Sequence, residues 1–260
     1  MKQFGITETG DPVNVDGWED RLLEANIIIS KELSDVMIEK LIDNQNKIIF
    51  HHTVTGLGGS VFEPNVLSQG HEFEQARKLF EAGFPISHYV LRVDPIVPLH
   101  EKIIDRAFIV MGLWSHFDRD YDTVLRCRIS MMDLYDHVRE RFENEKLVEN
   151  FAAKIPLSIP SNFTADDWAF EYVIKKLDEY KHLYKFECCA EPKLATVPWI
   201  DSCGCASEND LKILGLDPSE YGHPENPQRK TCMCLAKKQI LGVKPGRCEH
   251  QCLYCFWRDK

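Results

Sequence analysis

The chain has 260 residues, a formal net charge of −10, 44% hydrophobic residues and 28% charged residues. These values are ordinary for a globular protein, and the length fits one α/β barrel. Because the chain has no apolar run long enough to cross a membrane, no secretory signal and an acidic charge, we expect a cytoplasmic protein that binds neither membranes nor bulk nucleic acid.

The first 190 residues alternate β-branched runs with amphipathic stretches, which is typical of repeated β/α units. A capping-box pattern, Asp16 with Glu19, predicts a short helix over about residues 16–22. Each later helix is followed by a strand. The predicted helices cover about residues 33–41, 73–82, 99–113, 133–151 and 164–180, and the predicted strands cover residues 26–29, 47–53, 87–93, 123–130 and 184–188.

The character of the chain changes after residue 189. Residues 190–235 are rich in cysteine, proline and polar side chains, so we interpret them as a metal-binding insertion. A sixth strand is predicted at residues 239–243, and a cysteine-rich loop follows it. The expected organisation is one structural domain with β/α units over 1–189, the insertion over 190–235, and a last strand with its loop over 236–260.

Cysteines carry the strongest chemical signal. All of the 10 cysteines except Cys127 lie between residues 188 and 255. In a chain without a secretory signal this pattern indicates metal binding, while a lone cysteine on a strand, such as Cys127, is expected in the core.

Residues 248–255 read C-E-H-Q-C-L-Y-C, which places Cys248, Cys252 and Cys255 in a C-x3-C-x2-C spacing. Three thiolates so close together can hold three irons of a cubane cluster and leave the fourth iron open. The alternative is a structural zinc site in which His250 or a remote cysteine supplies the fourth ligand.

This spacing, with the aromatic Tyr254 before the last cysteine, resembles the signature of radical S-adenosylmethionine (SAM) enzymes. Residues 50–56, 92–96 and 228–234, together with the triplet, resemble a bacterial and phage family of conserved domains with C-terminal cysteines. More distantly, Ser30 with Lys31 and the turn at residues 92–95 are similar to segments of spore photoproduct lyase.

The resemblance implies a partial (β/α)6 TIM-like barrel. Radical SAM enzymes usually carry the motif after the first barrel strand, whereas here it follows the last one, so we expect a circular permutation. The strand before Cys248 should then lie parallel to, and beside, the strand that ends at Ser30.

The resemblance also implies a 4Fe–4S cluster that reductively cleaves SAM to a 5′-deoxyadenosyl radical, which abstracts hydrogen from a substrate. The distant likeness favours a nucleobase or modified nucleotide as substrate, and flavodoxin or ferredoxin is the expected type of electron donor. The alternative is a non-catalytic iron–sulfur or zinc protein for electron transfer or partner binding.

Polar residues at the strand ends are candidates for contacts with SAM. Arg92 is the preferred partner for its carboxylate, because a guanidinium binds carboxylates in a forked geometry. For each candidate, a purely structural hydrogen bond remains the alternative, and no catalytic residue is assigned. The candidates are Ser30, Lys31, Thr53, Thr55, Arg92, Arg128 and Ser130.

The second group of cysteines comprises Cys188, Cys189, Cys203, Cys205, Cys232 and Cys234. The resemblance favours an auxiliary 4Fe–4S cluster held by Cys189, Cys203, Cys232 and Cys234. Zinc competes with this cluster, because zinc supplies folding free energy directly to a loop-rich segment.

Overall fold

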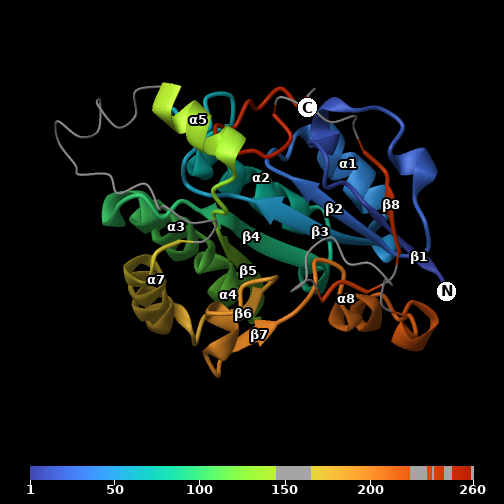
Figure 1. Ribbon diagram of the computed structural model, residues 1–260. Coiled ribbons are helices and arrows are strands. Elements are labelled where there is room, and N and C mark those ends of the chain that lie inside the picture. The colour runs from blue at the N-terminus through green and yellow to red at the C-terminus, as the bar shows by residue number, and fades with distance from the viewer. Residues whose placement is uncertain (145–164, 223–232, 236, 243–247, 259–260) are drawn as a thin grey trace.

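The computed structural model describes residues 1–144, 165–222, 233–235, 237–242 and 248–258 (Figure 1). They form an α/β fold around one 8-stranded sheet in the order β7-β6-β5-β4-β3-β2-β1-β8, in which every pair is parallel. The strands are β1 (Gln3–Ile6), β2 (Asn26–Ser30), β3 (Ile48–Thr53), β4 (Tyr89–Ile96), β5 (Leu125–Met131), β6 (Tyr184–Cys188), β7 (Ile200–Ser202) and β8 (Lys237–Ile240).

Several helices begin with side-chain caps. The hydroxyls of Ser34 and Ser68 accept hydrogen bonds from the amides of Met37 and His71, which satisfies free N–H groups in the first turn. None of the described helices combines the length and apolar character that a membrane span requires. The helices are α1 (Asp35–Asp43), α2 (Gln69–Glu81), α3 (Glu101–Trp114), α4 (His116–Tyr121), α5 (Asp136–Asn144), α7 (Asp167–Tyr180) and α8 (Glu208–Ile213).

Helices α1, α2, α3, α4 and α7 pack on one face of the sheet. Ile28 and Phe50 lie in the hydrophobic cluster that contains the buried residues of these helices. Residues of alternate parity, such as Ile27 and Ile49, lie in a separate cluster with Leu211 of α8. This one-sided arrangement is compatible with a partial barrel, although no pairing joins β7 to β8 in the described part of the chain.

The two adjacent histidines on β3 face opposite sides of the sheet, as the strand pattern predicts. Nδ1 of His52 lies 2.8 Å from the Tyr89 hydroxyl, and Nε2 lies 2.9 Å from Glu72, on the helix-covered side. His51 points to the opposite face, here called the inner face, which also carries Ile27 and Ile49. There Nη1 of Arg128 lies 3.4 Å from Nε2 of His51. The inner face of the sheet is therefore partly polar.

In the N-terminal region one prediction is wrong and one strand was missed. Residues 19–21 form a 3-10 turn instead of a longer helix, and Trp18 at its start provides no side-chain cap. Strand β1 was not predicted, because a four-residue segment containing Gly5 carries little β signal. A Cβ atom at Gly5 would lie 2.2 Å from Oδ1 of Asn26 on the neighbouring strand, so a larger residue would have to displace this buried side chain.

The prediction that the last strand lies directly beside β2 is also wrong. β8 is parallel to β2, but β1 lies between them and pairs with both. β8 itself begins at Lys237, before the predicted start.

The described parts of residues 190–235 are integrated with the sheet. β7 pairs with β6, and α8 contributes to the core on the inner face. Both elements were missed because they are short. The predicted helix over 133–151 is described as α5 (Asp136–Asn144), and its predicted residues 145–151 lie outside the described residues. Thr164, the predicted N-terminal cap of the next helix, lies outside them too.

Candidate metal and cofactor site

A cavity of about 340 Å³ lies at the carboxyl ends of the strands. Its walls include residues 7–11 after β1, Ser30 and Lys31 at the end of β2, Thr53 at the end of β3, and Ser130 near the end of β5. Parallel α/β folds place their ligand sites at this edge of the sheet, because the loops there are free to carry polar side chains.

Cys248, Cys252 and Cys255, the C-terminal triplet, all line this cavity. The loop is anchored by a hydrogen bond of 2.8 Å from the amide of Leu253 to the carbonyl of Phe62. Burial raises the pKa of Cys252 to about 12. Burial in apolar surroundings keeps a thiol protonated, so Cys252 by itself is not a reactive thiolate.

Glu63 joins the triplet loop to β2. Its buried carboxylate accepts hydrogen bonds from Nζ of Lys31 at 2.7 Å, from the Thr55 hydroxyl at 2.6 Å and from the Tyr254 hydroxyl. Burial alone would raise the pKa of Glu63, but Lys31 and these hydrogen bonds hold it below the ordinary value. Tyr254, the aromatic residue of the motif, is thereby fixed to a carboxylate that carries a full charge.

Asp11 makes a second link between the same segments. It accepts hydrogen bonds from the Ser30 hydroxyl at 2.5 Å and from the Lys31 amide at 2.6 Å, and it lies 2.9 Å from Nε2 of His250. Burial disfavours protonation of His250, but the adjacent Asp11 raises its pKa above the ordinary value. His250, which lies between Cys248 and Cys252 in the sequence, is therefore held by the carboxylate of Asp11.

Neither Asp11 nor Glu63 was among the residues expected from the sequence. Both lie in loops, beside Gly10 and after the glycine-rich segment 56–59, and that proximity to glycine was the only available signal. Their roles depend on contacts with residues more than 180 positions away in the chain, which no local pattern reports.

Arg92 and Thr53 line the cavity as expected. Nη2 of Arg92 donates a hydrogen bond to the carboxylate of Asp94. Thr53 is buried, and among the described residues its hydroxyl has no hydrogen-bond partner. A buried polar atom without a partner is costly, so this hydroxyl is well placed to bind a group inside the cavity.

Ser130 also lines the cavity, but its hydroxyl is engaged. It donates to the carboxylate of Glu191 at 2.8 Å, and the amide of Met131 donates to the same oxygen at 2.8 Å. Burial raises the pKa of Glu191 to about 7, although both hydrogen bonds oppose the shift. Ser130 therefore fixes the segment that follows β6.

Two expected cofactor contacts, Thr55 and Arg128, do not line the cavity. The Thr55 hydroxyl binds Glu63, and the guanidinium of Arg128 is buried against Glu187, with Nη2 at 2.5 Å and Nε at 3.1 Å from Oε2. Arg128 also lies 3.8 Å from Asp210 of α8. Both side chains are therefore engaged by carboxylates of the protein instead of lining the cavity.

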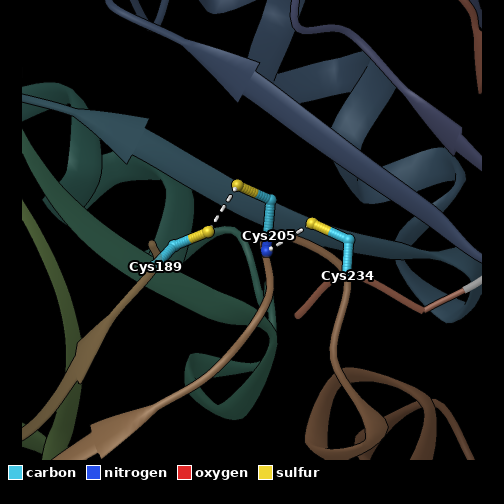
Figure 2. Close-up of side chains that lie close together, drawn as sticks. All are labelled: Cys189, Cys205 and Cys234. Atoms are coloured by element: carbon cyan, nitrogen blue, oxygen red, sulfur yellow. Dashed lines mark hydrogen bonds between the residues drawn. The ribbon is translucent and has the colours of Figure 1, made fainter. Parts of the chain in front are cut away.

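Cys189, Cys205 and Cys234, here called the thiol triad, gather at another part of the same cavity wall (Figure 2). Their sulfur atoms all lie within 4.8 Å of one another, and the Cys189 and Cys205 sulfurs are 3.5 Å apart. The Cys205 amide donates a hydrogen bond of 3.2 Å to the sulfur of Cys234. Contacts with the other two thiols lower the pKa of Cys234 and raise that of Cys189.

The thiol triad differs from the expected ligand set. Cys205 takes part in it, whereas Cys203 does not; the sulfur of Cys203 lies 3.9 Å from a carboxylate oxygen of Glu187. Cys232 lies outside the described residues. Cys127 is fully buried in the helix-covered core, as expected.

Neither the search of curated proteins nor that of solved structures found a significant match. A family model described as "Domain of unknown function (DUF1848)" matches residues 18–257. Because the match covers most of the chain and includes the C-terminal triplet, the strand ends and the thiol triad, the protein belongs to this family.

Proposed function

We propose that the protein is a radical SAM enzyme whose 4Fe–4S cluster is held by Cys248, Cys252 and Cys255. The observation that carries the proposal is that this C-x3-C-x2-C loop lines a cavity at the carboxyl edge of a parallel α/β sheet. When bound, the cluster supplies the electron that cleaves SAM to methionine and a 5′-deoxyadenosyl radical.

The donor set fits such a cluster. Three cysteines line one cavity, as a cubane requires, because each thiolate binds a different iron. Asp11 and Glu63 hold the loop through His250 and Tyr254, so the positions of the ligands are fixed by side chains of the cavity wall and by the buried Glu63.

Three residues of the cavity wall are suited to bind SAM. The unpartnered Thr53 hydroxyl offers a hydrogen bond to a polar group such as a ribose hydroxyl. In the described contacts Asp94 engages only Nη2 of Arg92, so the remaining N–H groups of the guanidinium can bind the carboxylate of SAM. Lys31 contributes a positive charge beside the triplet loop.

We further propose a circularly permuted barrel in a corrected form. Strands β1 to β7 follow one another across the sheet in chain order, and only β8 breaks the sequence, at the edge beside β1. Moving β8 to the beginning of the chain would give a consecutive order with the cluster loop after the first strand. The permuted strand, β8, pairs with β1, a strand that the sequence pattern did not predict.

For the substrate we propose only a chemical class. The hydrogen atom acceptor would be a radical generated in the cavity, so the substrate is a small molecule or a nucleobase-containing compound that enters it, and flavodoxin or ferredoxin is the proposed type of electron donor. The cavity wall contains both acidic and basic side chains, including Glu8, Arg92 and Lys238, which suits a polar substrate.

Anaerobic reconstitution tests the enzyme activity. The protein with iron, sulfide, dithionite and SAM should form 5′-deoxyadenosine above background, Cys252→Ala should abolish this product, and Cys127→Ala should retain it, since Cys127 lies in the core away from the cavity. Cluster formation should be checked by its absorbance and iron content. Equal 5′-deoxyadenosine from the wild type and Cys252→Ala, with a cluster in the wild type, would refute the proposal and favour electron transfer or partner binding.

A further inference from the structure

The thiol triad has the dimensions of a site for one metal ion. Sulfur ligands of a single tetrahedral zinc ion, with bonds of ~2.3 Å, lie about 3.8 Å apart. The Cys189 and Cys205 sulfurs are 3.5 Å apart, and all three sulfurs of the triad lie within 4.8 Å. The thiolates of a cubane each bind a separate iron and stand further apart, so the triad is too tightly gathered for a second cluster.

The backbone is shaped to bring these sulfurs together. A Cβ atom at Gly204 would lie 2.4 Å from the Cα of Cys234, so only glycine allows the two chain segments to approach this closely. The Cys205 amide donates to the Cys234 sulfur, and the Leu235 amide donates to the carbonyl of Ala206 at 2.9 Å. These contacts hold the segments at 203–206 and 234–235 in register.

The three cysteines also leave one position of a tetrahedral ion without a described protein ligand. All three line the cavity, so this position can be reached by a molecule in the cavity. Zinc sites with three protein ligands and an open position are typical of ions that bind substrate, and zinc prefers nitrogen and sulfur donors. Lys238 and Arg92 in the same wall offset the excess negative charge of three thiolates.

We propose that Cys189, Cys205 and Cys234 bind a single zinc ion whose fourth position opens into the cavity and takes a thiol or a ring nitrogen of the bound molecule. The zinc site is independent of the proposed radical chemistry, because it uses none of the C-terminal triplet. It takes the place of the auxiliary cluster that the resemblance favoured and agrees with the zinc alternative.

Metal analysis of the full chain tests the identity of the ion. A variant with Cys252→Ala and Cys255→Ala removes the triplet, and it should retain about one zinc per chain and no iron after dialysis against a chelator. Adding Cys205→Ser should release the zinc, whereas adding the matched control Cys203→Ser should not, since Cys203 lies outside the triad. Iron with sulfide in the triplet-free variant, or zinc retained by Cys205→Ser, would overturn the proposal.

Cobalt(II) substitution tests the open position without relying on a folded triad variant. The visible spectrum of the cobalt-loaded protein should show a tetrahedral ion with thiolate ligands, and imidazole or 2-mercaptoethanol should shift its bands. An unchanged spectrum with both probes, together with a changed spectrum in Cys232→Ser, would show that a fourth protein thiolate closes the site. That result would refute the open position, and a 5′-deoxyadenosine assay would still report on the triplet separately.

Discussion

Replacing Glu63 with glutamine should destabilise the protein and loosen the triplet loop. The Glu63 side chain is 1% exposed and that of its partner Lys31 is 16% exposed, so the substitution leaves a largely buried ammonium without its counter-charge. Breaking a buried ion pair by removing one partner costs roughly 3–5 kcal/mol, and glutamine restores part of the loss by accepting from the Thr55 hydroxyl. We expect a net loss of about 3 kcal/mol.

Thermal and urea unfolding of the metal-free protein measure this effect. For a chain of this size, about 3 kcal/mol corresponds to a fall in Tm of roughly 6–12 °C. The matched control is Glu74→Gln, which removes an ion pair whose side chains are 55% and 51% exposed, and it should cost less than about 1 kcal/mol. A double variant, Lys31→Met with Glu63→Gln, should recover part of the stability, because it removes both charges.

The reasoning would be refuted if Glu63→Gln and Glu74→Gln had the same effect. It would also fail if the double variant were as unstable as the sum of its single variants, since the two residues would then act independently. Reconstituted Glu63→Gln should in addition bind iron less tightly than the wild type, because Tyr254 loses its anchor within the triplet loop.

Three further predictions follow from the same contacts. Thr53→Val should change the free energy of unfolding by less than about 0.5 kcal/mol, while SAM binding measured by calorimetry should weaken several-fold. Thr55→Val should lower the free energy of unfolding in urea by about 1–2 kcal/mol, because among the two hydroxyls only that of Thr55 has a described protein partner. Gly204→Ala should lower zinc retention during chelator dialysis, while Gly70→Ala, whose Cβ would have no neighbour closer than 3.9 Å, should retain zinc at the wild-type level. The pKa of Glu63 is held below its ordinary value of 4.5, so the stabilisation from its ionised carboxylate should be fully present above about pH 4.5 and decline below it. The difference in urea midpoint between the wild type and Glu63→Gln should therefore narrow as the pH falls.

The sequence predicted the elements whose signals are strong and local. β2 is a run of buried isoleucines, and the β-branched or aromatic character of β3 to β6 placed these strands within a few residues of their observed bounds. β1 and β7 were missed because four and three residues are too few for a periodic signal, and their pairing with longer neighbours supplies what their own sequences lack.

The candidate site was predicted unevenly. Lys31 and Arg92 line the cavity, because polar residues at the ends of parallel strands meet at one edge of a sheet. Arg128 is also a polar residue near the end of a strand, but it forms ion pairs with Glu187 and Asp210 and does not line the cavity. Its partners come from β6 and α8, so a pattern within one strand does not distinguish it from Arg92.

The amino-acid sequence by itself determined the parallel α/β class and the C-terminal triplet, because strand periodicity and cysteine spacing are properties of neighbouring residues. Only the tertiary structure decided that Cys205, rather than Cys203, joins Cys189 and Cys234. The choice depends on the close approach of Gly204 to Cys234, a contact between segments about thirty residues apart. It likewise decided that Glu63 and Asp11 hold the triplet loop, because buried carboxylates act through whichever distant donors the fold brings to them.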